Sequence, residues 1–228
     1  MDPKTLKIYS LICSRDNNHS KTTLELFSYF KDAGIETKSL IKFDSIFNAY
    51  ECGIKRINPN PEDIIILCHD DIEIKNSKEE FIKILTDNTK DPGFIGVAGT
   101  KHFNRTGIWW NWSKPIYMSG RVDHGLKGQE HGTYFGPYGN TVVMDGVFLA
   151  CNGTTAKGLK WLKPSAFTGK WDFYDLFYTF QSYLLGFTNR TVPIMIRHES
   201  PGQMRESWHK NREAFISMYN DKLPAEVK

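Results

Sequence analysis

Several features that mark common protein classes are missing from this sequence. The N-terminus, MDPKTLKIYS, contains no apolar core of the kind that a signal peptide needs. No later apolar run approaches the roughly 20 residues that a helix needs to cross a bilayer. We therefore expect a cytoplasmic protein without a transmembrane segment.

Cysteine and charge are too sparse or too scattered to define a class of site. The four cysteines are Cys13, Cys52, Cys68 and Cys151. They form no C-x-x-C pair, which argues against a zinc knuckle and against a redox motif. The formal net charge is only +3, and Lys and Arg do not cluster. Because a basic patch is the usual signature of nucleic-acid binding, we expect no nucleic-acid partner.

The composition that is present predicts a folded globular chain. Hydrophobic residues make up 40% and charged residues 24% of the 228 positions, which is too apolar for intrinsic disorder. No Ser/Gly/Pro-rich linker divides the chain. We therefore expect a single domain over residues 1–228, made of a nucleotide-binding half at about 1–100, an acceptor half at about 101–200 and a C-terminal helix at 201–228.

The first hundred residues alternate between strand and helix patterns. Apolar runs predict strands at about 6–14, 35–43, 63–68 and 93–99. Apolar residues at helical spacing predict helices at about 20–33, 45–57 and 77–87. The run DIIILC is continuously apolar, as in a strand buried on both faces. This order predicts an α/β, Rossmann-like fold with right-handed crossovers and a mainly parallel, mixed central sheet flanked by helices.

The pattern changes after Thr100. Residues 101–140 are rich in Gly, aromatic and polar residues without helical periodicity, which predicts long loops. The rest of the chain predicts a strand, a helix, a strand and a helix, at 141–151, 172–186, 191–198 and 203–223. Trp109, Trp110 and Trp112 crowd the loop region. They can form a platform for sugar rings, and packing of a long loop onto the core is an equal alternative.

Three carboxylates follow directly on the apolar strand at 63–68. They are Asp70, Asp71 and Glu73. In open α/β sheets ligands bind beyond the carboxyl ends of strands, and carboxylate oxygens suit Mg²⁺ or Mn²⁺. Alternation along an extended chain predicts Asp71 and Glu73 on one side and Asp70 on the other. A solvated acidic turn that caps the next helix is the alternative interpretation.

These acids belong to an ordered set of motifs. A strand ends in His-Asp-Asp, a later segment reads Asp-Gly-Val-Phe-Leu-Ala, a helix carries Phe-Tyr-Asp, and a late strand ends in His. The set resembles the GT-A glycosyltransferases, in particular the small groups allied to family two and the single-domain viral enzymes of this size. The resemblance covers about residues 5–200. It implies a GT-A fold and metal-dependent transfer of a sugar from a nucleotide-diphosphate sugar.

The resemblance also implies a metal site. By matching position, Asp71 binds Mn²⁺ or Mg²⁺ with Asp70 or Glu73 as its neighbour, and the choice stays open because the sequence departs from a strict Asp-x-Asp. His198, at the end of the late strand, completes the site in this interpretation. Taken alone, a strand-end His is more often surface or hydrogen-bonded structure. Other histidines show no ligand spacing and are assigned to no metal: His69, His102, His124 and His131.

The resemblance further implies where the donor lies. Ser14, Arg15 and Asp16 end the first strand, where such enzymes receive the nucleotide, and an ordinary polar loop is the alternative. Asp145 lies in the strand predicted at 141–151, which borders the donor sugar in the resembling family. The following Gly146 permits close approach of another group. A paired structural role for Asp145 is the alternative, because a buried acid is costly unless it is paired.

Asp172 and Asp175 are three residues apart and therefore share one face of the predicted helix. The resembling family has its functional acid in a Phe-Tyr-Asp element, which favours Asp175 as the catalytic base of an inverting transfer. Asp172 is the second catalytic candidate and is better placed as the helix N-cap. The alternative is that both acids only cap the helix and oppose its dipole.

Three classes of function can be weighed on these residues. A sugar-phosphate nucleotidyltransferase would share the half-sheet and the metal, but CSRDNNHS contains no Gly-rich phosphate loop. A non-catalytic carbohydrate-binding module would explain the tryptophans but not the acids at a strand end. We therefore predict a glycosyltransferase with a nucleotide-sugar donor and a glycan, lipid-linked or protein acceptor.

Overall fold

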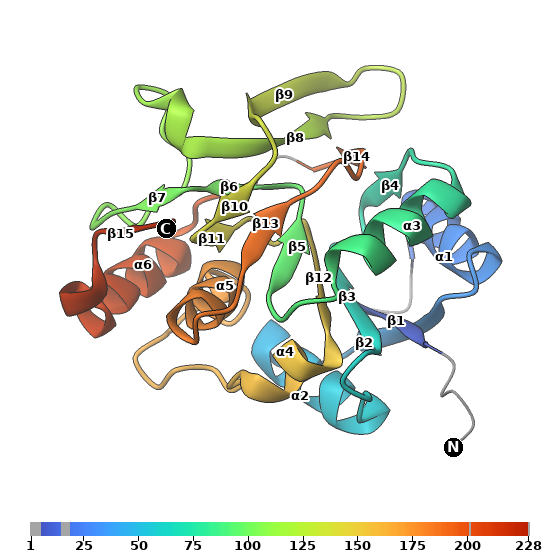
Figure 1. Cartoon of the computed structure of the whole chain (residues 1–228), viewed down its shortest axis with the longest axis horizontal. Helices are drawn as coiled ribbons and strands as arrows, with labels where there is room; N and C mark the ends of the chain where they lie inside the picture. The colour runs from blue at the N-terminus through green and yellow to red at the C-terminus, as the bar shows by residue number, and fades with distance from the viewer. Residues whose placement is uncertain (1–5, 15–18, 201, 228) are drawn as a thin grey trace.

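The computed structural model describes residues 6–14, 19–200 and 202–227 (Figure 1). The α-helices are α1 (Lys21–Asp32), α2 (Ile46–Ile57), α3 (Lys78–Asn88), α4 (Gly153–Gly158), α5 (Tyr174–Leu184) and α6 (Glu206–Met218). Two short 3-10 helices are η1 (Pro115–Tyr117) and η2 (Asn220–Lys222). Within the described residues no helix has the length and apolar character that crossing a bilayer requires.

The strands in both halves of the chain vary in length from two to seven residues. The first are β1 (Ile8–Ser14), β2 (Glu36–Ile41), β3 (Ile64–Cys68), β4 (Ile72–Ile74), β5 (Phe94–Gly96), β6 (Ala98–Thr100) and β7 (His102–Phe103). The later ones are β8 (Met118–His124), β9 (His131–Gly136), β10 (Asn140–Thr141), β11 (Val143–Met144), β12 (Phe148–Asn152), β13 (Asn189–Thr191), β14 (Ile196–His198) and β15 (Ala225–Glu226).

A seven-stranded sheet forms the centre of the molecule. Its order is β10-β13-β5-β12-β3-β1-β2. The strands β2, β1, β3, β5 and β13 run in one direction, whereas β12 and β10 run in the other. The predicted α/β class is confirmed, and the sheet is mixed, with an antiparallel strand at its centre. That strand, β12, comes from the second half of the chain and lies between two strands of the first.

Helices cover both faces of this sheet. The chain moves from β1 to its neighbour β2 and then back past β1 to β3, so right-handed crossovers place α1 and α2 on opposite faces. On one side, Phe81 of α3 packs against Phe30 of α1 and Phe148 of β12. On the other side, Phe47 of α2 packs against Tyr178 of α5. Because both faces are covered, every residue of β3 is buried.

The three helices of the first half begin in the same way. Ser20, Ser45 and Ser77 each accept a hydrogen bond from the backbone N–H three residues later. These side chains satisfy amide groups that a helix start otherwise leaves unpaired. The sequence therefore sets these helix starts locally, in agreement with the predicted boundaries.

The region at 101–140 is more regular than predicted. It contains β7, η1 and an antiparallel hairpin of β8 and β9, which projects at the top of Figure 1. The hairpin joins a second sheet of order β11-β6-β8-β14-β4, with β9 on the side of β8. The prediction of long loops is wrong here. Glycines at 120, 132 and 136 and a register shift at Gly120/Arg121 hide the alternation that marks a strand.

Three predicted strands are divided. The segment at 93–99 breaks at Val97 into β5 and β6, which belong to different sheets. The segment at 141–151 breaks into β11 and β12 around Asp145 and Gly146, so Asp145 lies in a turn and not in a buried strand. The segment at 191–198 ends one strand and begins another, with Pro193, which has no N–H to donate to a ladder, between them. The breaks at Asp145 and at Pro193 leave non-strand backbone at the end of the sheet where β3 ends, and side chains there can form a site.

Strand pairing brings distant segments to that edge. Phe148 at the start of β12 lies opposite Cys68 at the end of β3, because the two strands are antiparallel. The N–H of His69 accordingly donates to the carbonyl of Val147 at 3.2 Å. The strand β14 pairs with β4 and places His198 opposite Ile72. The ends of β3 and β14 and the turn before β12 therefore meet.

Candidate active site

His69, Asp71 and His198 form a cluster at this edge. The ligand atoms of the three residues lie within 4.8 Å of one another, and it is the one such group of His, Cys, Asp or Glu among the described residues. Asp71 Oδ1 lies 3.3 Å from His198 Nε2, which in turn lies 3.2 Å from His69 Nδ1. Two imidazoles and one carboxylate offer both nitrogen and oxygen donors. This mixed set fits Mn²⁺ better than Mg²⁺, which prefers all-oxygen surroundings.

The surroundings of Asp71 and His69 shift their pKa values toward the forms that can bind a cation. Burial by itself would raise the pKa of Asp71, but the hydrogen bond and charge of His198 and the charge of His69 hold it well below its usual range. The Ser200 hydroxyl and N–H also donate to Asp71 Oδ2. Burial, and next the neighbouring His198, lower the pKa of His69. An ionised carboxylate therefore faces an imidazole that favours its neutral, metal-binding form.

Tyr174 determines which nitrogen of His69 is free. Its hydroxyl donates to the carbonyl of Gly146 at 3.1 Å, and a carbonyl can only accept. The Tyr174 oxygen therefore accepts from His69 Nε2–H, which lies 3.1 Å away. We assign the lone pair of His69 to Nδ1, the atom that faces His198. A partner that fixes the tautomer of a ligand in this way is typical of metal-binding histidines.

Asp175 lies on the other side of Gly146, in the first turn of α5. Its Oδ2 accepts the Gly146 N–H at 2.8 Å. Burial, and next the charge of Asp145, raise the pKa of Asp175 to about 7. A Cβ at Gly146 would lie 2.4 Å from the Tyr174 hydroxyl and 2.8 Å from Asp175 Cβ, so only glycine fits. Asp145 itself accepts the N–H of Val147 at 2.9 Å, which closes the turn.

Asp172 does not cap α5. The N-cap is Phe173, which has φ 67° and makes no side-chain cap hydrogen bond. Asp172 Oδ2 instead accepts from the Ser207 hydroxyl at 2.6 Å and so ties the segment before α5 to α6. The predicted capping role is wrong because the left-handed turn at Phe173 carries Asp172 away from the helix amides. Asp172 still borders the same cavity as Asp175.

Glu73 is not brought to the cluster. Its Oε2 accepts from Arg197 Nε at 2.8 Å, and Lys127 lies 3.5 Å from its other oxygen. Arg197 is only 1% exposed and also donates to the Gly125 carbonyl. In the ladder of β4 and β14, Glu73 lies directly opposite Arg197, whereas Asp71 precedes the strand. The predicted shared direction of Asp71 and Glu73 is therefore wrong, and Glu73 neutralises a buried guanidinium.

Asp70 lies toward the end of β1. Burial, and next the charge of Asp70, raise the pKa of the Cys13 thiol to about 12, which places Asp70 near that strand. Ser14, the last residue of β1, is buried, and its hydroxyl has no hydrogen-bond partner among the described residues. Such an orphaned polar atom is available to a ligand. Arg15 and Asp16, which were predicted to contact the nucleotide, lie outside the described residues.

A cavity of about 470 Å³ lies beside the cluster. The two histidines of the cluster, three aspartates and several aromatic side chains line it. The groups of its lining that can carry chemistry are His69, His124, His198, Asp145, Asp172 and Asp175. Sequence reasoning missed His69 because it has no regular spacing from another histidine. Its position between the apolar strand and Asp70 was the available signal.

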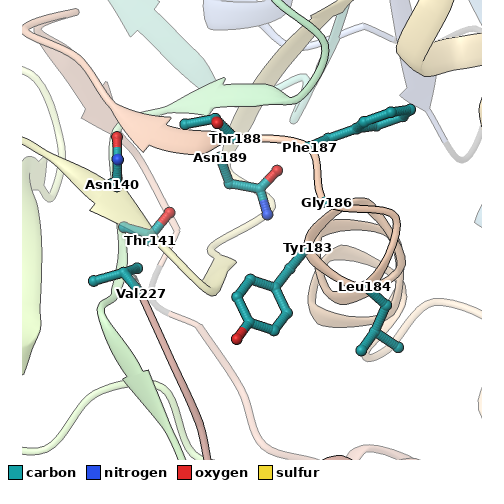
Figure 2. A pocket seen from close by; sticks show the side chains of 9 residues that line it. All are labelled: Asn140, Thr141, Tyr183, Leu184, Gly186, Phe187, Thr188, Asn189 and Val227. Atoms are coloured by element: carbon teal, nitrogen blue, oxygen red, sulfur yellow. The ribbon is translucent and has the colours of Figure 1, made fainter.

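A second cavity, of about 400 Å³, is remote from this chemistry. Figure 2 shows it between the C-terminal end of α5 and the strands that carry Thr141 and Asn189. The described residues that line it include no acid, histidine, cysteine, lysine or arginine. The Asn189 amide donates to the carbonyls of Val142 and Thr179 and accepts from Phe94 N–H. This asparagine is a structural crosslink of buried backbone.

Comparison with known proteins agrees with the geometry. The sequence profile of the glycosyltransferase-like family matches residues 11–225. No curated protein sequence matches the chain significantly. GalNAc-T7, solved with UDP, GalNAc and Mn²⁺, is similar with a TM-score of 0.59 at 9% identity, covering 95% of this chain and 49% of that one. A197 from STIV matches with a TM-score of 0.46 at 9% identity, covering 82% of each chain. This chain thus spans about half the length of GalNAc-T7, and the likeness concerns the fold.

Proposed function

Because this chain belongs to the glycosyltransferase-like family and has a GT-A fold, we propose that it transfers a sugar from a nucleotide-diphosphate sugar to an acceptor hydroxyl, with Mn²⁺ as its cation. The observation that carries the proposal is the position of Asp175 in one cavity with two of the three cluster residues, His69 and His198. A group that can accept a proton therefore lies beside a group that can hold a cation.

Asp71, His69 and His198 would hold the proposed cation, through a carboxylate oxygen, Nδ1 and Nε2 respectively. When bound, it would supply positive charge to the donor diphosphate and so stabilise the leaving group. The chain keeps two of these ligands in place through Tyr174 on His69 and Ser200 on Asp71. Ser14 and Asp70 lie at the neighbouring strand end, where we propose that the nucleotide binds.

The proposed base is Asp175, and the proposed transfer inverts the anomeric centre. The acceptor hydroxyl gives its proton to the Asp175 carboxylate as its oxygen bonds to the anomeric carbon, and the bond from that carbon to the diphosphate oxygen breaks. A pKa of about 7 suits a base at neutral pH, since the ionised form is present and still basic. Asp145 borders the same cavity and is proposed to face the donor sugar.

The test is metal-dependent nucleotide binding by the full chain. Melting temperatures are measured with UDP, GDP and dTDP, each with Mn²⁺, with Mg²⁺ and with EDTA. Ligand at about 100 times its dissociation constant would add about 2.7 kcal/mol of stability, which a melting curve resolves. We expect stabilisation by one nucleotide with Mn²⁺ only, followed by hydrolysis of the matching nucleotide sugar. Binding of sugars without any nucleotide effect would instead favour a carbohydrate-binding module.

Matched variants connect this result to the cluster. Asp71→Ala should abolish the Mn²⁺-dependent part of the shift, because it removes the only carboxylate of the three ligands. Glu73→Gln is the control: it should lower the melting temperature, since buried Arg197 loses its ionised partner, but keep the Mn²⁺-dependent shift. An Asp71→Ala protein with the parent shift would contradict the metal assignment.

A further inference from the structure

We propose that the aromatic wall of the cavity binds the acceptor and that the acceptor end is a neutral saccharide. This inference rests on the proposed glycosyl transfer and adds the chemical class of the second substrate. It starts from the tryptophans of the hairpin region, which pack partly into the core and partly line the cavity.

Aromatic rings form a continuous wall along the cavity. Trp112 stacks on Phe135 at 5.5 Å with an interplanar angle of 23°, and Trp109 contacts Phe135 at 5.0 Å. From Trp109 the contacts continue through further rings to the start of α5, with centroid separations of 5.6, 6.0 and 5.4 Å, along Trp110, Trp208 and Phe173. The wall thus ends next to Tyr174 and Asp175.

The wall has an inner, supporting part and an outer, accessible part. Trp109 is 5% exposed, whereas Trp112 is 58% exposed, although both line the cavity. Trp171, in the segment before α5, also lines it and is 40% exposed. A large exposed aromatic side chain held on a packed support offers a rigid flat face to a ligand at low entropic cost. The C–H face of a pyranose ring matches such a surface.

The polar groups of the cavity are those of a polyol site. Asp145, Asp172, Asp175, Gln203 and Thr133 line it and offer acceptors and donors to sugar hydroxyls. No Lys or Arg occurs among the described residues of the lining. The proposed cation serves the donor diphosphate, so a phosphate-bearing acceptor would bring its charge against three carboxylates without a Lys or Arg partner, which is unfavourable at low dielectric. The cavity favours a saccharide whose end is uncharged.

The experiment uses the full chain with Mn²⁺ and whichever of UDP, GDP and dTDP stabilises it, and measures binding of acceptor probes by saturation-transfer NMR and tryptophan fluorescence. The probes are the neutral sugars lactose, cellobiose and maltotriose, with glucose 6-phosphate and a polyprenyl phosphate as charged alternatives. We expect at least one neutral sugar to bind and to quench tryptophan fluorescence. Tighter binding of the phosphate-bearing probes than of every neutral sugar would overturn the proposal.

Variants test the wall itself. Trp112→Ala and Trp171→Ala should each weaken binding of the neutral sugar by about tenfold, while the affinity for Mn²⁺ and the nucleotide stays at the parent value. Tyr134→Ala is the matched control, because Tyr134 is 62% exposed on β9, next to the cavity residue Phe135, but does not line the cavity. Equal sugar affinity in Trp112→Ala, Trp171→Ala and the parent refutes the saccharide wall and leaves the proposed function intact. Absence of Mn²⁺-dependent binding of UDP, GDP and dTDP by the parent refutes the proposed function separately.

Discussion

Replacing Asp175 with Asn should change both catalysis and stability, in opposite directions. The carboxyl ionises near pH 3.8 in an unfolded chain and at about 7 in the folded one. The folded protein therefore binds the extra proton between these values, and stability falls as the pH rises from about 4 to about 7. Three units of pKa correspond to about 4 kcal/mol as an upper value at pH 8.

The neutral Asn variant lacks this penalty and can still accept the Gly146 N–H through its carbonyl oxygen. Relative to the parent, its free energy of unfolding should be similar near pH 4 and higher by up to about 4 kcal/mol at pH 8. Urea unfolding at pH 4, 6 and 8 measures the difference. A difference that does not grow with pH would refute the burial argument.

Catalysis gives a second, independent result. Transfer by the parent should increase about tenfold per pH unit below about 7 and level off above it, because the ionised fraction of the base rises in this way. Asp175→Asn should reduce transfer by about 10² to 10⁴-fold with donor affinity retained. Glu73→Gln is the control, since Glu73 pairs with Arg197 and does not line the cavity, and it should retain transfer. A pH-independent parent rate would exclude Asp175 as the base.

Two further predictions concern the groups that meet at Gly146. Tyr174→Phe should weaken Mn²⁺ binding by about 10 to 100-fold, because His69 loses the partner that fixes its tautomer. Calorimetry with Mn²⁺ and ¹⁵N NMR of His69 in the metal-free protein check this, and an unchanged affinity together with an unchanged tautomer would contradict it. Gly146→Ala should destabilise the fold by about 1–3 kcal/mol, because the new methyl overlaps Tyr174 and Asp175. An unaltered melting temperature would show that the turn has room that the structure does not indicate.

The alternating strands and helices of the first hundred residues could be predicted from the sequence because their signals are local. The buried run of β3 and the serine caps of α1, α2 and α3 each lie within a few residues of the element they specify. The hairpin of β8 and β9 could not be predicted, because its strands are defined by pairing with each other and with β6 and β14. Glycine at a register shift removes the side chain that would have shown the alternation.

The candidate site also combines features that the sequence predicts with features that only the fold determines. The position of Asp71 at a strand end follows from the sequence. The predicted shared helix face of Asp172 and Asp175 does not hold, because α5 begins at Tyr174 and Asp172 lies before it. The different uses of Glu73 and Asp71 depend on which strand pairs with β4, which only the folded sheet determines. The participation of His69 depends on Tyr174, more than a hundred positions away. A contact between residues so far apart in the chain produces no periodic pattern in a single sequence.

The central position of β12 has a consequence for how the chain reaches this structure. As the protein is synthesised, β3 and β5 leave the ribosome before β12, which hydrogen-bonds to both of them. Until Asn152 has emerged, each of these strands keeps an open edge that can pair with another chain. The sheet must therefore close late, by a long-range insertion that also carries Asp145 and Gly146 to His69. Its formation should be slow compared with that of the flanking helices, and the cluster of His69, Asp71 and His198 and the core should appear in the same folding step.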